Sequence, residues 1–462
     1  MAPFVTYISV ALRKTLSQIN YTPAFAGCIS HSNPENRPLN KQVTMNTTVI
    51  HLRSESKPLE RRSPISPASA KALLEAGYAV HVEKSPGRIY KDEEFETVGA
   101  KMVPEGSWPT VPEDHIIAGL KELPDDGSSL PHSHIQFGHC YKQQDGWAEY
   151  LARFARGGGI LYDIEFLKGE DGVRVAAFGY WAGYAGAAVA LLAWSHQVQR
   201  PGVPLGAVPL YSSAAAMVDD VKAKVSDALR TVGDFPQIIV IGSLGRCGRG
   251  AIDLCLAAGI PPSTLLKWDM AETAKGGPFK EITDSDIFIN CVYLGSKVIP
   301  PFTTLESLSK PGRRLRVLCD VSLDPNNPNN PVPVYSSYSS FKEPTLKVPV
   351  QGDGPDLTVV SIDHLPSLVA REASDEFSGL LLPSLLTLNR RKTEGVWTGA
   401  EKLYHQKVQE IPSSAQFSLR NAIIEFCISY GGIKGGARPV WPQVRSSPEW
   451  GSSPTPSQVL LL

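Results

Sequence analysis

The chain of 462 residues is too long for one ordinary hydrophobic core, so two or three domains are expected. A hydrophobic content of 42% and a charged content of 20% are typical of a soluble globular protein, and the formal net charge of -1 gives no reason to expect nucleic acid or an anionic membrane as a partner. The seven cysteines have no regular spacing and form no CxxC pair, which argues against a secreted disulfide framework and favours a reducing compartment.

The first 44 residues differ in composition from the rest of the chain. They contain one acidic residue, Glu35, among serines, threonines and a few basic residues, which weakly resembles an organelle transit peptide. No regular amphipathic pattern with arginines accompanies this composition, and Met45 stands directly before the first strand-like run. We therefore expect residues 1–44 to be a disordered or mispredicted extension.

Strand-like and helix-like segments alternate after this extension. Residues 48–54 (TVIHLRS) and 78–85 (YAVHVEKS) predict strands, and residues 66–77 between them predict a helix that begins at Ser66 and Pro67. Three further apolar strands are expected, at residues 114–123, 133–142 and 159–167. Near-continuous apolar strands joined by helices are typical of a parallel sheet covered on both faces, so the pattern predicts an α/β fold.

Residues 175–194 (VAAFGYWAGYAGAAVALLAW) contain no charge and are long enough to span a bilayer. The segment also contains a GxxxG pattern, from Gly179 to Gly183. Its Ala and Gly residues contribute little to membrane insertion but allow close packing against a sheet or a helix. A buried helix is therefore the expected structure, with a membrane span as the alternative.

The segment QIIVIGSLGRCGRGAIDLCL (237–256) leads from an apolar strand through a glycine-rich turn into a small-residue helix. Its glycines follow the pattern GxxGxxG, at Gly242, Gly245 and Gly248. Such a turn lets phosphate oxygens approach backbone N–H groups at the helix N-terminus. Asp269 follows at roughly the 20 residues expected for an acid that binds the adenosine ribose, and its charge favours NAD over NADP. The alternative is a tight turn in an ordinary βαβ unit, with Arg246 facing solvent rather than phosphate.

A second series of strands and helices continues from this turn to residue 369, which predicts two Rossmann-like domains with parallel sheets and a ligand cleft between them. Cys247 in the turn and Cys291 in a later strand can come close in space, so a disulfide between them stays open. The Pro- and Ser-rich C-terminal tail is expected to be disordered.

Two titratable residues follow strands of the first domain, where ligands of open α/β sheets bind. Lys121 and His139 could there perform two proton transfers, and Glu165 at a third strand end could tune them. Arg53 and Arg62 would suit an anionic substrate. For each of these residues, a packed or surface role is the alternative. The absence of HExxH, GxSxG and GxxxxGK[ST] removes support for zinc hydrolases, serine esterases and P-loop ATPases.

The combination of motifs resembles one family. The matching strings are HLRSESKPLERR, IIAGLKELP, HIQFGHCYK, LYDIEFL, VAAFGYWAGYAGAA, IGSLGRCGRGAIDL, DIFINCVYL, LCDVSLD and SIDHLPSL. In this order, over about residues 46–410, they resemble the NAD-dependent, L-lysine-forming saccharopine dehydrogenases of fungal lysine biosynthesis. The resemblance implies an alanine-dehydrogenase-like architecture and the conversion of saccharopine, NAD and water to lysine, 2-oxoglutarate and NADH, by hydride transfer and then imine hydrolysis.

The resemblance also implies site residues. Lys121 and His139 would be the acid/base pair. Substrate contacts are expected at Arg62, Lys121, Gln144, Phe178, Ser322, Leu323 and Asp324. NAD contacts are expected at Arg174, Gly245, Arg246, Asp269, Thr273, Tyr293, Val321, Ile362, Asp363, His364 and Leu365. No metal is expected.

In the domain organisation that the resemblance implies, the first domain spans 45–200 and is completed by 366–410, the NAD-binding domain spans 201–365, and residues 411–462 form a disordered or mispredicted tail. The chain has Val173 and Arg174 where the family often has paired arginines, which leaves one basic side chain for cofactor contact. It ends in LLL rather than a peroxisomal S-K-L, so we expect a cytoplasmic protein. We also expect a monomer. Two other functions stay open: an alanine-dehydrogenase-like amino-acid oxidoreductase and a catalytically silent NAD-binding homologue. The retention of Lys121, His139 and Arg62 speaks against a silent protein.

Overall fold

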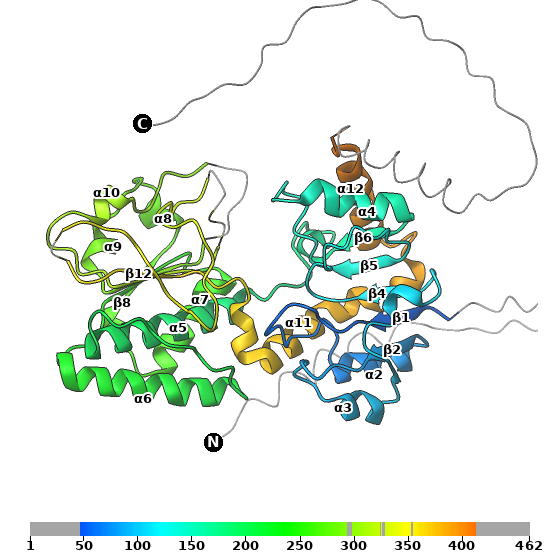
Figure 1. Ribbon diagram of the computed structural model, residues 1–462, viewed down its shortest axis with the longest axis horizontal. Helices are drawn as coiled ribbons and strands as arrows, with labels where there is room; N and C mark the ends of the chain where they lie inside the picture. Colours follow the sequence, from blue (N-terminus) through cyan, green and yellow to red (C-terminus); the bar gives the residue numbers. More distant parts are fainter. Residues whose placement is uncertain (1–46, 293–297, 324, 326–328, 353, 413–462) are drawn as a thin grey trace, which may run out of the picture. The chain divides into compact units, whose positions relative to one another are not determined.

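The computed structural model describes residues 47–292, 298–323, 325, 329–352 and 354–412 (Figure 1). The expected extensions at 1–44 and 411–462 lie outside the described residues, except for Ile411 and Pro412.

The first sheet has six strands in the order β3-β2-β1-β4-β5-β6, and every pair of neighbours is parallel. Its strands are β1 (Val49–Leu52), β2 (Ala79–Glu83), β3 (Lys101–Val103), β4 (Ile116–Ala118), β5 (Ser133–Gln136) and β6 (Ile160–Asp163). The helices of this part are α2 (Pro67–Glu75), α3 (Asp92–Thr97) and α4 (Trp147–Gly157), together with α11 (Ala370–Leu385) and α12 (Gly395–Gln409) from the end of the chain. This strand order is that of a dinucleotide-binding fold, with its switch point between β1 and β4.

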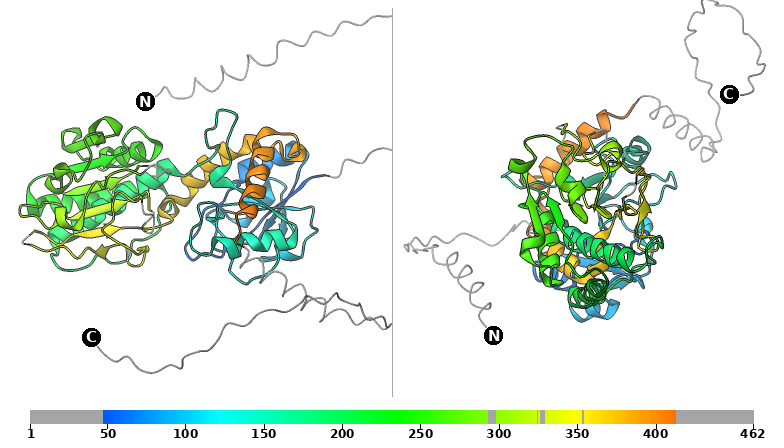
Figure 2. Two further views of the ribbon diagram at one scale, coloured as in Figure 1. Left: turned by 90° about the horizontal axis from the view of Figure 1, so that it is seen from above. Right: turned by 90° about the vertical axis from the view of Figure 1, so that its left-hand side faces the viewer.

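Helices α11 and α12 pack on this first sheet although more than 200 residues separate them from its last strand, β6. Phe377 of α11 and Trp397 of α12 belong to the same buried cluster as Ile50 and Val80 of the strands. Figure 2 shows these helices, in orange, beside the blue and cyan strands. At the start of α2, Ser66 accepts a hydrogen bond from the Ser69 N–H, and Pro67 occupies the first turn, as the sequence predicts.

The second sheet has the strand order β11-β12-β10-β9-β7-β8, with β11 antiparallel at one edge. Its strands are β7 (Ile238–Ile241), β8 (Leu265–Trp268), β9 (Ile287–Asn290), β10 (Val317–Asp320), β11 (Leu346–Lys347) and β12 (Thr358–Val360). The remaining helices are α5 (Gly179–Gln199), α6 (Ala214–Val232), α7 (Arg246–Ala257), α8 (Met270–Thr273), α9 (Lys280–Asp284) and α10 (Leu305–Leu308). Alternate residues of the strands enter two different cores, one on each face, as in a sheet buried on both sides. The predicted α/β class with two Rossmann-like sheets is confirmed.

The uncharged segment forms the buried helix α5, whose residues from Gly183 to Ser195 are all buried. Its small residues permit close packing: a Cβ added at Gly183 would lie 1.8 Å from the carbonyl oxygen of Cys247 in α7. Among the described residues, no helix is long and apolar enough to cross a membrane. The buried-helix prediction is therefore confirmed.

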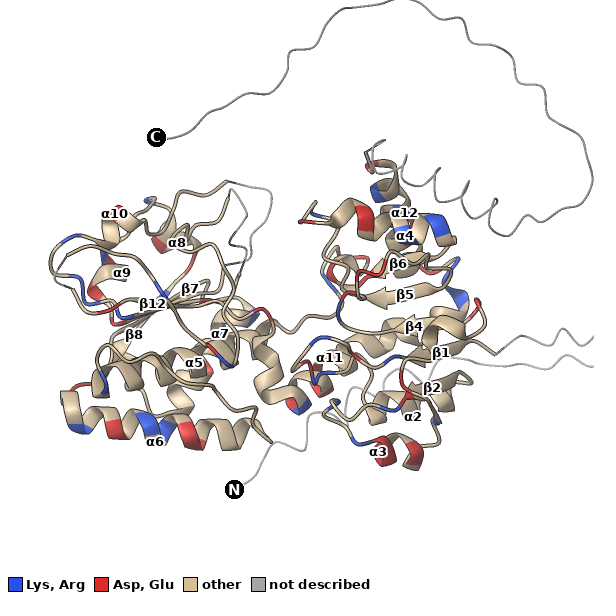
Figure 3. Cartoon of the chain, viewed as in Figure 1, with Lys and Arg blue, Asp and Glu red and all other residues tan. Residues whose placement is uncertain are grey.

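Helix α6 shows the contrasting amphipathic pattern. It buries Met217, Val221 and Val225 at intervals of four residues, and these side chains join the core of the second sheet. Its exposed face carries charges of both signs (Figure 3).

Candidate active site

Lys121 lies three residues beyond the carboxyl end of β4, and its side chain is 6% exposed. Its Nζ lies 3.1 Å from Oδ2 of Asp363, which also accepts a hydrogen bond from Lys57. Asp363 follows the last parallel strand of the second sheet. Burial alone would raise the pKa of Asp363, but the ammonium groups of Lys121 and Lys57 hold that pKa well below its usual range.

The backbone of Lys121 is fixed by a second acid. Glu55 accepts hydrogen bonds from the N–H groups of Leu120 (2.7 Å) and Lys121 (3.0 Å). Arg53 pairs with Glu55 at 3.3 Å and also donates to the carbonyl oxygen of Lys121. Arg53 is thus a buried support for the backbone of Lys121, which agrees with the packed role that the sequence leaves open.

His139 lies three residues beyond the end of the neighbouring strand β5, and its side chain is 36% exposed. Its Nδ1 lies 3.0 Å from Oε2 of Glu122, the residue next to Lys121. Burial would raise the pKa of Glu122, but the hydrogen bond and charge of His139 lower it to about 2. When the ring is neutral and its proton on Nδ1 is donated to this carboxylate, Nε2 carries the lone pair that can accept a proton. The φ of 48° at His139 is an uncommon conformation for a residue other than glycine, of the kind that clusters at functional sites.

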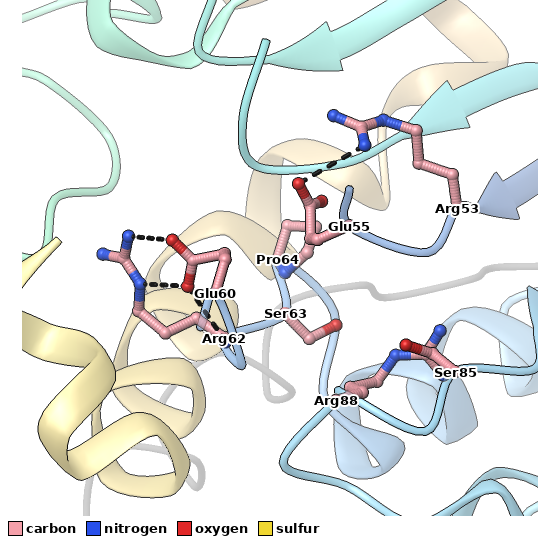
Figure 4. A pocket seen from close by; sticks show the side chains of 8 residues that line it. All are labelled: Arg53, Glu55, Glu60, Arg62, Ser63, Pro64, Ser85 and Arg88. Atoms are coloured by element: carbon pink, nitrogen blue, oxygen red, sulfur yellow. Dashed lines mark hydrogen bonds and ion pairs between the residues drawn. The ribbon is translucent and has the colours of Figure 1, made fainter. Parts of the chain in front are cut away.

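Arg62 forms the third element, in a pocket lined by Arg53, Glu55, Glu60, Arg62, Ser63, Pro64, Ser85 and Arg88 (Figure 4). Its guanidinium donates two hydrogen bonds to Glu60, at 2.8 and 2.5 Å, and this charge lowers the pKa of the buried Glu60 to about 2 against the effect of burial. The guanidinium carbon also lies 4.4 Å from the ring centre of Phe178, which stacks on Phe377 at 4.1 Å.

The glycine-rich turn joins β7 to α7. Gly242 has a φ of 88°, and a Cβ at Gly248 would lie 2.2 Å from the carbonyl oxygen of Gly242. Gly245 is the N-cap of α7, so the first N–H groups of that helix face the turn. Asp269 accepts a hydrogen bond from Leu244 N–H at 2.9 Å, which places its carboxylate beside the turn. These features fit a dinucleotide: the turn is open to a pyrophosphate, and the acid suits ribose hydroxyls.

Comparison with known proteins agrees with this geometry. The family model "Alanine dehydrogenase/PNT, N-terminal domain" matches residues 51–185. The saccharopine dehydrogenase (NAD(+), L-lysine-forming) of Neurospora crassa is 55% identical over 371 residues, which cover 80% of this chain and 99% of that protein. Proteins of the same name from Emericella nidulans and Schizosaccharomyces pombe are each 52% identical, over 80% and 78% of this chain and 100% and 99% of their own lengths.

The chain belongs to the saccharopine dehydrogenase family. The resemblance stated from its motifs is thereby confirmed. A solved L-alanine dehydrogenase is similar with a TM-score of 0.52 at 17% identity, over 78% of this chain and all of the other. That similarity shows the shared fold.

Four of the other residues expected from the saccharopine dehydrogenase family make hydrogen bonds within the chain. Gln144 accepts from Lys142 N–H, and Arg174 donates to the Ala176 carbonyl and lies over the ring of Phe137. Ser322 donates to the Val292 carbonyl, and Thr273 donates to the carbonyl of Asp269.

Three of the expected residues have buried side chains: those of Ile362 and Leu365 are part of the second sheet's core, and burial lowers the pKa of His364 to about 4. Only the backbone of Ile362 and Leu365 could therefore reach a ligand. Leu323 has a φ of 46°, and Val321 packs near Gly186. Tyr293 and Asp324 lie outside the described residues.

The disulfide left open between Cys247 and Cys291 is not formed. Both residues are free thiols, and they are close enough for a hydrogen bond between them. Burial is the main cause that raises the pKa of Cys291 far above its usual value, so this thiol stays protonated. The expectation of proximity was right, but the covalent bond is absent.

Four polar partners were missed from the sequence: Glu122 of His139, Glu60 of Arg62, Lys57 of Asp363, and Glu55, which accepts from the Lys121 N–H. Glu122 and Glu60 are sequence neighbours of predicted site residues, so their position was a signal that could have been used. Glu165, which was expected to tune the acid/base pair, forms its ion pair with Lys142 at 2.6 Å.

Proposed function

We propose that this protein catalyses the NAD-dependent oxidative deamination of L-saccharopine to L-lysine and 2-oxoglutarate. The proposal rests above all on one observation: Lys121 and His139 follow adjacent parallel strands, and Glu122 joins their loops, in a chain 55% identical to a saccharopine dehydrogenase. Residues at the carboxyl ends of neighbouring parallel strands lie at one edge of the sheet, where ligands of this fold bind.

The glycine turn, Arg246 and Asp269 would hold NAD, which when bound would supply the hydride acceptor. The substrate's secondary amine must lose a proton before its α-carbon can lose hydride. We assign this proton to the Nζ of Lys121, which can accept it once Nζ has released the proton that it carries in its ion pair with Asp363.

His139 acts on water. The imine that follows oxidation needs a water molecule, a base that removes its proton, and an acid that protonates the departing lysine amine. The Nε2 of His139 suits these transfers because Glu122 holds Nδ1–H and the ring is partly exposed to solvent.

Arg62 would bind a carboxylate of the substrate. It is now paired with Glu60, so a substrate carboxylate would share or replace that partner. Gln144, Phe178, Ser322 and Leu323 are proposed as further lining of the substrate site, and Arg174 and Thr273 as NAD contacts.

The test is NADH absorbance after saccharopine is added to the purified protein with NAD. Stoichiometric lysine and 2-oxoglutarate are expected with the NADH. NADH formation from alanine instead would support the alanine-dehydrogenase-like alternative, and NAD binding without turnover of either compound would support a silent homologue. Either result would refute the proposal. A monomer in the cytoplasm is part of the same proposal, and light scattering coupled to size-exclusion chromatography tests the oligomeric state.

A further inference from the structure

One face of the first sheet carries a cluster of histidines. His51 in β1 and His81 in β2 are paired in register, and His115 stands directly before β4, which pairs with the other side of β1. Because strand side chains alternate, these three rings share one face of the sheet. The opposite face of the same strands carries Ile50, Val80 and other members of the apolar core. The labelled strands β2, β1 and β4 can be followed side by side in Figure 1.

The three rings converge. One ring nitrogen from each residue lies within 4.8 Å of one ring nitrogen of each of the others. The ring centres are 6.3 Å apart for His51 and His81, and 5.4 Å apart for His81 and His115. A tetrahedral zinc ion keeps imidazole nitrogens roughly 3.4 Å apart, because each Zn–N bond is about 2.0–2.1 Å long. Side-chain rotations that move the ring nitrogens by about 1 Å would therefore bring the three ligands to bonding distance.

The two ring nitrogens of His51 have different surroundings. Its Nε2 lies 3.1 Å from Oε1 of the buried Glu83, and its Nδ1 is buried with no hydrogen-bond partner among the described residues. A carboxylate that holds one ring nitrogen of a ligating histidine sets the tautomer and leaves the lone pair on the other nitrogen. The Nδ1 of His115 is likewise buried without a partner. Unpaired buried polar atoms are costly, and a metal ion bound through these two Nδ1 atoms would satisfy both of them.

Glu83 itself is held as a carboxylate. It accepts hydrogen bonds from the N–H groups of Ser54 (2.9 Å), Gly106 (3.0 Å) and Trp108 (2.8 Å). These bonds occupy both of its oxygens and keep it beside His51 as a fixed negative charge. The nearby cation, Lys101 in β3, has an exposed side chain that solvent can screen.

We propose that His51, His81 and His115 form a binding site for one divalent transition-metal ion of the zinc type. Glu83 positions His51, and water or an exogenous anion completes the coordination. The ion would join three neighbouring strands on the face opposite the apolar core. None of its ligands is among the residues proposed for saccharopine oxidation, so the site is structural rather than catalytic.

The experiment uses the purified full chain, treated with a chelator and then titrated with Zn²⁺ or Co²⁺ alone. We expect one equivalent of Zn²⁺ to bind, with a rise in Tm of at least about 2 °C when free Zn²⁺ exceeds Kd 100-fold. Bound Co²⁺ is expected to give the visible absorption of a four-coordinate nitrogen and oxygen site, without a thiolate charge-transfer band. Such a band would instead place the metal on the cysteines and overturn the proposal.

Three variants separate the site from non-specific binding. His81→Gln and His115→Gln should each weaken Zn²⁺ binding at least about 10-fold. His405→Gln, an exposed histidine on α12, is the matched control and should bind like the wild type. Circular dichroism without metal checks that each variant is folded.

Absence of stoichiometric binding by the wild-type chain overturns the proposal. Equal affinity in the wild type and in folded His81→Gln and His115→Gln overturns it as well. Neither measurement depends on turnover of saccharopine, so failure of the metal proposal and failure of the proposed function are distinguishable.

Discussion

The most direct test of the dinucleotide turn is Gly248→Ala. A Cβ at this position would lie 2.2 Å from the Gly242 carbonyl oxygen, 2.6 Å from Ser243 Cα and 2.8 Å from the Gly242 carbonyl carbon. All three atoms belong to the backbone, so relief requires the turn and the first turn of α7 to separate by about 1 Å. Overpacking of this kind costs about 1–3 kcal/mol. The same displacement would move the N–H groups proposed to hold the pyrophosphate, and we expect NAD to bind at least about 10-fold more weakly, or about 1.4 kcal/mol.

Gly379→Ala provides the matched control, because it makes the same chemical change inside a helix. Gly379 lies in α11 and has no atom within 4 Å of an added Cβ. Alanine should stabilise this helix by about 0.5–1 kcal/mol and leave NAD affinity unchanged. Titration calorimetry with NAD and thermal unfolding measure both effects. Wild-type NAD affinity and Tm in Gly248→Ala would refute the reasoning about the turn.

Two other predictions concern the substrate side, and a third concerns the pH dependence of stability at the buried Asp163. Lys121→Met and His139→Gln should each lower kcat about 10²–10⁴-fold with nearly unchanged Kd for NAD, and full activity in both would contradict the acid/base assignment. Arg62→Lys should raise KM for saccharopine because the bidentate geometry is lost; an unchanged KM would remove Arg62 from the substrate site. Burial raises the pKa of Asp163 from 3.8 to about 6, so the folded state binds this proton more tightly than the unfolded state. The contribution of Asp163 to the free energy of unfolding is therefore greatest below pH 3.8. It falls by about 3 kcal/mol as the pH rises to about 6. Chemical unfolding of Asp163→Asn between pH 4 and 7 should show a smaller loss of stability than the wild type, and equal losses would argue against the raised pKa.

Local patterns predicted the fold and the strand-end positions of the proposed site well. The apolar strands and the glycine turn are short-range signals, and the carboxyl ends of parallel strands place Lys121 and His139 at one sheet edge without further information. The buried helix α5 was also accessible, because a segment rich in Ala and Gly is better suited to close packing than to a bilayer.

The polar partners were less accessible because they depend on tertiary structure. Lys121 and Asp363 are 242 residues apart, and no periodicity links them. The histidine cluster depends on the strand order β2-β1-β4, which follows neither from sequence spacing nor from composition. His51 and His81 interrupt apolar strands, and only their register shows that they are neighbours.

The charges of the proposed site are already paired within the protein. Arg62 is held by Glu60, and Asp363 is shared by Lys57 and Lys121. Burying Arg62 or Glu60 alone would cost several kcal/mol, so each of these charges is held in place by its partner. Saccharopine carboxylates would then replace or share existing partners rather than create new buried ion pairs. The net gain in binding free energy per substrate carboxylate is therefore modest, and discrimination between substrates depends on geometry. A substrate that lacks one carboxylate leaves the corresponding basic residue with its internal partner. A misplaced carboxylate meets Glu60 or Asp363 and is repelled.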